Sequence, residues 1–291
     1  MKCLFEGSAT ALVTPFSCGK VDNFALENLI EKCIVEGVKA IVVLGTTGES
    51  ATVTDDERVA IIKLAKKTIA GRVKLIVGTG SNNFEKAYQY TLLAKEFGVD
   101  GALVVSPYYN KTSQDGIIEY YKRLCEIKLP IIMYNVPSRT GLNIEIDTIK
   151  RLANLDMIYG LKESTSDIDR IINLSQVCKN KIALYSGEDH LNYIFYALGG
   201  QGTVSVTANA FPMQVQKVFD LVQLGLFKDA SQLQNKLQGI NKALFCQTNP
   251  IPIKYLLSTM GLCKNELRLP LIPISTNGKK IIEKQQKRLS L

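Results

Sequence analysis

Strand-like and helix-like patterns alternate along most of the chain, and this alternation limits the folds that it can adopt. Short apolar runs predict eight strands, and the segments between them have the apolar period of amphipathic helices. Eight strands alternating with eight helices close into an α/β fold, the (β/α)8 TIM barrel. The predicted strands are Ala9–Thr14, Ala40–Gly45, Val73–Gly78, Gly101–Ser106, Pro130–Val136, Tyr159–Ser164, Ile182–Ser186 and Thr203–Thr207.

One predicted helix carries a clear start signal. Thr54-Asp55-Asp56-Glu57 has the spacing of a capping box, with acidic residues at the positive end of the helix. An apolar stripe follows at Val59, Ile62, Ala65 and Ile69. The sequence therefore predicts a helix after the second strand.

The pattern changes to helices alone after the eighth predicted helix, Pro212–Leu224. The chain has 291 residues, whereas a barrel of this kind takes about 250. We expect a barrel over residues 1–225 and a C-terminal helical appendage over 226–291, docked tightly because no Gly/Ser-rich linker separates them. The predicted appendage helices are Lys228–Phe245, Pro252–Met260 and Gly278–Ser290.

Cysteine and histidine usage excludes several kinds of site. The seven cysteines never occur as C-x-x-C, which argues for reduced thiols and against a disulfide framework or a structural zinc site. His190 is the single histidine, so no metal site rich in histidine can form. It lies in Gly187–Asn192, which is typical of a strand-to-helix turn, and there we expect a capping or solvated role. We predict no metal.

Hydropathy and charge limit the kinds of partner that this chain is expected to bind. Apolar stretches such as Ala40–Leu44 are far shorter than the roughly 18 residues of a membrane span, and the amino terminus lacks the features of an export signal. We expect a cytoplasmic protein with no membrane partner. The net charge is +8, but the basic residues are dispersed, and the dense run at 279–288 also carries apolar residues. That run fits a solvated terminal helix, so we expect no nucleic-acid partner.

Lys162 lies in the predicted strand Tyr159–Ser164, between the helical patterns Ile144–Leu152 and Ile168–Cys178. A lysine partly withdrawn from water has its ammonium form disfavoured, so its amine can attack a carbonyl near neutral pH. Lys162 is therefore a candidate for a Schiff base. A solvated lysine at a strand end is the ordinary alternative, and this run of residues alone favours it.

Residues after other strands could share the same barrel mouth, because the carboxyl ends of barrel strands form the reactive face. Gly45–Ser50 offers amides and hydroxyls that can hold an anion, although it lacks the Gly-Lys ending of a phosphate loop. Tyr108 and Tyr109 follow the fourth strand, and Tyr134–Gly141 includes an arginine that could bind a carboxylate. Tyrosines also pack in cores and interfaces, and loop arginines also pair with surface acids.

Together these residues resemble a known family. The matching motifs are Gly45-Thr46-Thr47-Gly48-Glu49, Tyr134-Asn135-Val136-Pro137-Ser138-Arg139-Thr140-Gly141, Gly160-Leu161-Lys162-Glu163, Ser205-Val206-Thr207-Ala208-Asn209 and Asn249-Pro250-Ile251-Pro252-Ile253-Lys254. They are similar to those of the pyruvate-dependent class I aldolases of the dihydrodipicolinate synthase and N-acetylneuraminate lyase superfamily. The resemblance runs nearly from end to end and is specific.

The resemblance implies a mechanism. Lys162 would form an iminium with pyruvate, and the cationic nitrogen would act as the electron sink, so no cofactor is expected. Tyr134 would stand beside the lysine, with Thr46 and Tyr109 completing a proton relay. In family members Tyr109 reaches the neighbouring subunit's site, which implies a homo-oligomer, usually a tetramer built as a dimer of dimers.

The resemblance also assigns substrate contacts. Thr47, with Thr46, would hold the carboxylate of pyruvate, and Gly187 and Val204 would line the pocket through backbone groups. Arg139 would bind the carboxylate of L-aspartate 4-semialdehyde. The product would be 4-hydroxy-tetrahydrodipicolinate, at the first committed step of diaminopimelate and lysine biosynthesis.

Two alternatives stay open at this point. A pyruvate-dependent sugar-acid aldolase, of the N-acetylneuraminate lyase or 2-keto-3-deoxy-sugar-acid aldolase type, would use the same lysine, but such enzymes do not generally place an arginine after the tyrosine motif. A barrel without catalytic activity could serve as a sensor or scaffold. The retained lysine, tyrosines and arginine argue against that second alternative.

Family members that are inhibited by lysine bind it at a subunit interface. Possible allosteric matches here are Ser50, Ala51, Asn82 and Tyr108. However, Lys86 stands where lysine-sensitive enzymes place a glutamate, and Asp55 and Arg58 replace histidines. A cation facing the ligand's ammonium repels it. We therefore predict weak or absent lysine inhibition, unless the neighbouring Glu85 compensates.

Overall fold

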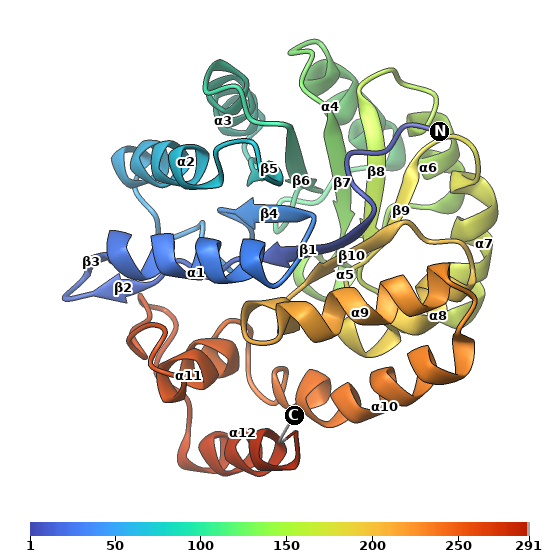
Figure 1. Ribbon diagram of the computed structural model, residues 1–291. Coiled ribbons are helices and arrows are strands. Elements are labelled where there is room, and N and C mark those ends of the chain that lie inside the picture. The colour runs from blue at the N-terminus through green and yellow to red at the C-terminus, as the bar shows by residue number, and fades with distance from the viewer. Residues whose placement is uncertain (290–291) are drawn as a thin grey trace.

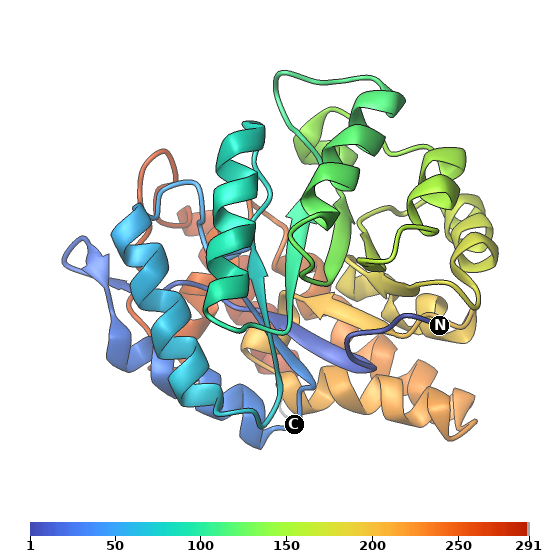
Figure 2. The ribbon, with the colours of Figure 1, turned by 90° about the horizontal axis from the view of Figure 1, so that it is seen from above.

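The computed structural model describes residues 1–289 and forms a closed barrel of eight parallel strands (Figures 1 and 2). Every barrel strand falls within three residues of a predicted run, so the predicted (β/α)8 TIM barrel is confirmed. In chain order the barrel strands are β1 (Gly7–Ala11), β4 (Ala40–Val43), β5 (Lys74–Gly78), β6 (Gly101–Val105), β7 (Ile131–Asn135), β8 (Ile158–Glu163), β9 (Ala183–Ser186) and β10 (Gly202–Ser205), which pairs with β1.

Helices surround the barrel and cover the outer face of its strands (Figure 2). The predicted capping box is present: Thr54 Oγ1 accepts from the Glu57 N–H at 3.3 Å, and Glu57 Oε2 accepts from the Thr54 N–H at 3.0 Å. The surrounding helices are α1 (Asn23–Val35), α2 (Asp55–Ile69), α3 (Phe84–Glu96), α4 (Gln114–Cys125), α6 (Ile146–Leu152), α7 (Ile168–Cys178), α8 (Asn192–Ala197) and α9 (Pro212–Gln223).

Several short elements were not predicted from the sequence. A two-stranded hairpin, β2 (Phe16–Ser17) and β3 (Lys20–Val21), follows β1, and α5 (Pro137–Thr140) follows β7. Two short 3₁₀ turns, η1 (Asp189–Leu191) and η2 (Thr207–Asn209), follow β9 and β10. Three of these elements, α5, η1 and η2, come directly after barrel strands and therefore shape the barrel mouth.

The strands are buried on both faces, which explains why they appear in the sequence as nearly continuous apolar runs. One apolar cluster fills the barrel interior and includes Ala40, Ile76, Ile132 and Val204. A larger cluster lies between the strands and the helices around them. The barrel is a packed scaffold, so its functional groups are confined to the ends of the strands.

Three C-terminal helices follow the barrel, as predicted: α10 (Phe227–Ala243), α11 (Ile251–Thr259) and α12 (Thr276–Arg288). Ser290, included in the last predicted helix, lies outside the described residues. Helix α10 packs against α8, α9 and η1, and α11 packs against α12 and η2 (Figure 1). The division of the chain into units 1–225 and 226–291 stays a prediction, because these helices are packed directly onto the barrel.

Candidate active site

A cavity of about 590 Å³ lies at the carboxyl ends of the barrel strands. It contains residues from five barrel strands, from loops that follow barrel strands and from the segment between α10 and α11. The lining residues are Ala11, Val42, Gly45, Thr46, Thr47, Leu103, Tyr134, Val136, Ser138, Arg139, Lys162, Ser164, Gly187, Glu188, Val206, Phe245, Gln247, Thr248 and Asn249.

Lys162 and Tyr134 form the centre of this cavity. They are register partners on the adjacent strands β8 and β7, and each is 6% exposed. The Lys162 Nζ lies 4.1 Å from the centroid of the Tyr134 ring. Lys162 therefore does not have the surroundings of a solvated lysine, because its amine is enclosed with a phenol in a pocket that a small molecule can enter.

The loop after β4 brings Thr46 and Thr47 to the cavity. Gly48 is tightly enclosed, because a Cβ there would lie 3.2 Å from both the Leu12 oxygen and the Leu44 nitrogen. Thr47 is buried, and its Oγ1 accepts a hydrogen bond from Asn249 Nδ2 at 2.9 Å. This bond ties the loop to the segment between α10 and α11.

Arg139 enters the cavity from α5. Its Nη2 donates to the Asn249 carbonyl oxygen at 3.1 Å, and its side chain is otherwise exposed. The guanidinium forms no ion pair with a carboxylate of the described residues, so its remaining N–H donors are available to a ligand.

Gly187 and Val204, both predicted to line the pocket, have different surroundings. A Cβ on Gly187 would lie 2.2 Å from Ser164 Oγ and 3.1 Å from Lys162 Cε, so a larger residue would displace the serine and crowd the lysine. Val204 is 1% exposed and belongs to the apolar cluster inside the barrel. Val206, two residues later, lines the cavity instead.

Tyr109 does not reach the cavity of its own chain. Its side chain is 91% exposed, and its φ of 70° lies in the left-handed region that is uncommon for a tyrosine. Next to it, Asn110 Nδ2 donates to the Asn82 carbonyl oxygen at 2.9 Å. Within one chain the structure thus brings Thr46, Tyr134 and Lys162 to a common cavity and leaves Tyr109 outside it.

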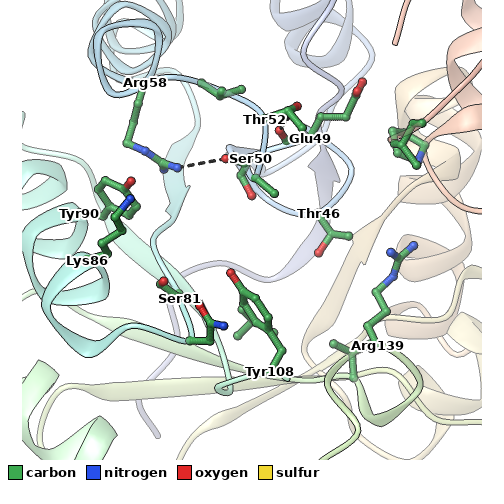
Figure 3. Close-up of a pocket in the computed structure, with 18 of the residues that line it drawn as sticks. Thr46, Glu49, Ser50, Thr52, Arg58, Ser81, Lys86, Tyr90, Tyr108 and Arg139 are labelled. Atoms are coloured by element: carbon green, nitrogen blue, oxygen red, sulfur yellow. Dashed lines mark hydrogen bonds between the residues drawn. The ribbon is translucent and has the colours of Figure 1, made fainter. Parts of the chain in front are cut away.

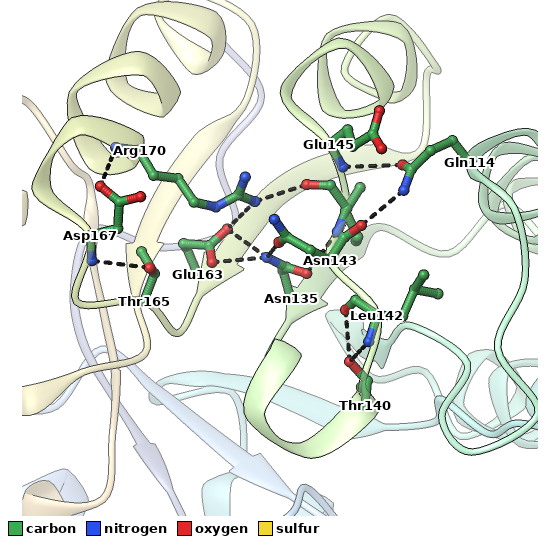
Figure 4. A network of polar contacts seen from close by, with 11 residues as sticks. Gln114, Asn135, Thr140, Leu142, Asn143, Glu145, Glu163, Thr165, Asp167 and Arg170 are labelled. Atoms are coloured by element: carbon green, nitrogen blue, oxygen red, sulfur yellow. Dashed lines mark hydrogen bonds and ion pairs between the residues drawn. The ribbon is translucent and has the colours of Figure 1, made fainter.

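A buried polar network behind β7 and β8 holds these two strands in register (Figure 4). Asn135 Nδ2 donates to both carboxylate oxygens of Glu163, at 2.9 and 3.0 Å, and Arg170 Nη2 donates to Glu163 Oε2 at 2.9 Å. Burial raises the pKa of Glu163, and the charge of Arg170 opposes that shift. Because Asn135 and Glu163 directly follow Tyr134 and Lys162, the network fixes the strands that carry the reactive pair.

Glu188 is a cavity residue that the sequence did not identify. Its carboxylate lies 3.5 Å from His190 Nδ1 and is 25% exposed. Burial raises the pKa of Glu188 to about 7, the charge of Asp189 adds to the shift, and Lys162 opposes it. The only sequence signal for Glu188 is its position directly after Gly187 at the end of a strand.

The segment between α10 and α11 is the other part of the site that the sequence left unassigned. Phe245, Gln247, Thr248 and Asn249 line the cavity, although they follow the whole barrel in the chain. Asn249 begins one of the motifs that resemble the aldolase family, and that motif was the available signal.

A second cavity of about 770 Å³ lies beside the first, and Thr46 and Arg139 line both (Figure 3). All four residues matched to an allosteric site, namely Ser50, Ala51, Asn82 and Tyr108, line it.

Cations and carboxylates both line this second cavity: Arg58, Lys86 and Arg139 on one hand, Glu49 and Asp55 on the other. Arg58 is 4% exposed, stacks 3.9 Å from the centroid of the Tyr90 ring and donates to the Ser50 carbonyl oxygen at 3.4 Å. Lys86 also lines the cavity, together with Asp55, whereas Glu85 is not among the lining residues.

Two further features of residues 1–289 concern membrane spans and metal sites. Over this range no helix is long and apolar enough to cross a bilayer. The same residues include no group of three or more histidine, cysteine, aspartate or glutamate side chains placed to hold a metal ion.

Comparison with known proteins agrees with the geometry of the site. The profile of the Dihydrodipicolinate synthetase family matches residues 4–289. A 4-hydroxy-tetrahydrodipicolinate synthase from Thermodesulfovibrio yellowstonii is 44% identical over 282 residues, which is 96% of this chain and 97% of that protein.

Solved structures give the same result. The 4-hydroxy-tetrahydrodipicolinate synthase of Methylacidiphilum fumariolicum has a TM-score of 0.96 at 37% identity, over 98% of this chain and 96% of that one. A DHDPS from Cyanidioschyzon merolae, solved with lysine bound, has a TM-score of 0.96 at 35% identity over 100% of both chains. Since profile, sequence and structure agree over almost the full length, the chain belongs to the dihydrodipicolinate synthetase family.

Proposed function

We propose that the chain condenses pyruvate with L-aspartate 4-semialdehyde to give 4-hydroxy-tetrahydrodipicolinate, at the first committed step of diaminopimelate and lysine biosynthesis. The observation that carries this proposal is the Lys162 amine, enclosed with Tyr134 in a cavity that the Arg139 guanidinium also lines. Relatives that align over the full chain carry the name of this activity.

The first half of the reaction forms the nucleophile. The Lys162 nitrogen attacks the carbonyl carbon of pyruvate, and water leaves after protonation of the former carbonyl oxygen, giving an iminium. The methyl carbon then loses a proton to give an enamine, and the electron pair is held by the nitrogen. Tyr134 and Thr46 relay these protons with a Tyr109 from a neighbouring subunit. No cofactor is needed, because the iminium itself is the electron sink.

The carboxylate of pyruvate is held at the loop after β4. Thr46 and Thr47 supply hydroxyls and backbone amides, and the hydrogen bond from Asn249 fixes the Thr47 side chain. Gly187 lines the opposite side of Lys162, where its lack of a side chain leaves room for the iminium. Val204 contributes by packing, because it belongs to the apolar cluster inside the barrel.

The second half joins the two substrates. The enamine carbon attacks the aldehyde carbon, and the aldehyde oxygen takes a proton and becomes a hydroxyl. The amino group of the semialdehyde then attacks the iminium carbon and displaces the Lys162 nitrogen, which closes the ring and frees the enzyme. Arg139 binds the substrate carboxylate in a bidentate manner.

Replacing Arg139 with leucine tests that contact. We expect kcat/KM for the semialdehyde to fall by about 30- to 800-fold, which corresponds to the roughly 2–4 kcal/mol of a lost bidentate contact. Steady-state kinetics with each substrate varied should leave kcat/KM for pyruvate unchanged, because pyruvate reacts before the semialdehyde binds. An equal loss for both substrates would contradict the assignment.

Lysine titration tests the second cavity. Because Lys86 and Arg58 present positive charge there, we expect half-inhibition by lysine only above about 1 mM, a dissociation constant that represents weak binding. Initial rates measured against lysine check this, and Lys86→Glu should increase sensitivity. Half-inhibition of the unchanged protein below that concentration would contradict the prediction.

The exposed position of Tyr109 supports a homo-oligomer, with a tetramer as the expected form. A tyrosine that is 91% exposed and held at positive φ is suited to reach a neighbouring subunit's site.

The seven cysteines are all free thiols, which supports a reducing, cytoplasmic compartment.

Borohydride trapping tests the proposed function directly. The protein is incubated with pyruvate, reduced with borohydride and digested, and the peptides are analysed by mass spectrometry. We expect a pyruvate-derived secondary amine on Lys162 and loss of activity in proportion to labelling. A label on another lysine, or no label, would overturn the proposal.

A further inference from the structure

Glu188 presents a carboxylate to the active cavity that the mechanism above does not use. Its polar contact within the described residues is with His190 Nδ1 at 3.5 Å. The adjacent Asp189 has the opposite environment, because its Oδ2 accepts from the backbone N–H groups of Val206 and Thr207, both at 2.9 Å. Asp189 is therefore committed to the fold, whereas Glu188 is available to a ligand.

The barrel places Glu188 and Arg139 on opposite sides of the reactive lysine. Strand β8 carries Lys162 and pairs with β7 on one side and with β9 on the other. Arg139 follows β7, Glu188 follows β9, and both line the cavity. Two strand spacings amount to about 9.6 Å. The charged ends of both side chains can thus reach one small molecule above the lysine.

The backbone holds Glu188 firmly in this place. The Glu188 N–H donates to Ser186 Oγ at 3.2 Å, and that hydroxyl donates to the Glu188 carbonyl oxygen at 3.1 Å. The close approach of Gly187 to Ser164 fixes the same turn against β8. The backbone from which the Glu188 side chain extends into the cavity is therefore set by the fold, as recognition requires.

We infer that Glu188 binds the ammonium group of the second substrate while Arg139 binds its carboxylate, so that the site selects an α-amino aldehyde. This inference rests on the proposed function and deepens it. Both charged groups of the substrate lie on one carbon, and the aldehyde must point toward the enamine on Lys162. The contacts with Glu188, with Arg139 and with the enamine, held in a fixed arrangement, would also select one enantiomer at that carbon.

The ionisation of the surrounding groups is consistent with this role. Lys162 favours the charged form of Glu188, whereas Asp189 and Glu163 disfavour it, and burial has the largest effect, giving a pKa of about 7. Burial also lowers the pKa of His190, which disfavours the charged imidazolium that would pair with the carboxylate. An arriving ammonium group would favour the charged form.

Glu188→Gln tests the inference, with two aldehydes as probes. One is L-aspartate 4-semialdehyde, and the other is succinate semialdehyde, which lacks only the amino group. Because the aldehyde without an amino group cannot close the ring and release Lys162, both rates are measured in a single turnover, as carbon–carbon bond formation with the preformed enamine. We expect the ratio of the two second-order rate constants to fall by about 10- to 100-fold in the variant, as for the loss of a charge-assisted hydrogen bond. Glu119→Gln, which removes the same charge from the exposed face of α4, should leave the ratio unchanged.

A pH series on the unchanged protein gives an independent measurement. Since the carboxylate form of Glu188 increases as the pH rises through about 7, preference for the amino-bearing aldehyde should grow severalfold between pH 6 and 8. Both aldehydes form the carbon–carbon bond with the same enamine, so the titration of the enamine and of its proton relay cancels in the ratio of these rate constants. Glu188→Gln should remove this growth, and Glu188→Asp should retain part of it.

The outcomes separate this inference from the proposed function. If borohydride traps pyruvate on Lys162 in the unchanged protein but Glu188→Gln leaves the ratio of the two aldehydes unaltered, the inference is wrong and the Schiff-base chemistry stands. If no pyruvate is trapped on Lys162, the proposed function has failed, and the inference fails with it. A flat pH series for the unchanged protein also overturns the inference.

Discussion

Replacing Lys162 with alanine should lower kcat by at least about 10⁴-fold, since removal of a covalent nucleophile abolishes the steps that depend on it. The variant should also acquire no mass after incubation with pyruvate and borohydride. The physical reason is that Tyr134 and Thr46 can move protons, but neither provides the nitrogen that holds the electron pair of the enamine. Coupled kinetic assays and intact-protein mass spectrometry measure the two effects.

A matched control is available on the surface. Lys228 is exposed on α10, and Lys228→Ala should keep both full activity and full labelling. Thermal melting of the two variants shows whether each is folded. Activity of Lys162→Ala near that of the control would remove the basis of the proposed mechanism.

Replacing Lys254 with methionine should lower the free energy of unfolding by about 3–5 kcal/mol. The melting temperature should fall by roughly 10 °C as a result. Lys254 is 0% exposed, forms an ion pair with the buried Glu49 and lies 4.1 Å from the centroid of the Phe16 ring. Its Nζ also donates to the Glu266 carbonyl oxygen at 2.9 Å. The variant would leave the Glu49 charge buried without its cation, and calorimetry measures the cost.

The double variant Glu49→Gln/Lys254→Met separates charge from packing. Removing both charges should restore much of the lost stability, because an uncompensated buried charge costs more than a neutral pair. Glu49 belongs to the loop that carries Thr46 and Thr47, so KM for pyruvate should rise in Lys254→Met. A single variant that melts like the unchanged protein would contradict the expectation.

The barrel could be predicted because its physical signals are local. Strands buried on both faces appear as short apolar runs, and Thr54 with Glu57 marks a helix start within four residues. The predicted strand Ala9–Thr14 extended too far, since β1 ends at Ala11. The hairpin β2–β3 and helix α5 are too short for periodicity to reveal.

The site was less predictable because its chemistry depends on orientation. Glu188 and Asp189 are adjacent acids in the sequence, yet one lines the cavity and the other caps a backbone turn. Nothing local distinguishes them. The predicted roles of Lys162 and Tyr134 depended on family motifs, whereas their contact follows from the pairing of β7 with β8.

The segment that closes the catalytic cavity has a consequence for protein synthesis. Phe245, Gln247, Thr248 and Asn249 leave the ribosome only after every barrel strand has emerged. Until they emerge, the cavity lacks these four lining residues, and the hydrogen bond between Thr47 and Asn249 cannot form. The wall that this segment adds around the reactive amine is therefore made only after the barrel that carries the amine.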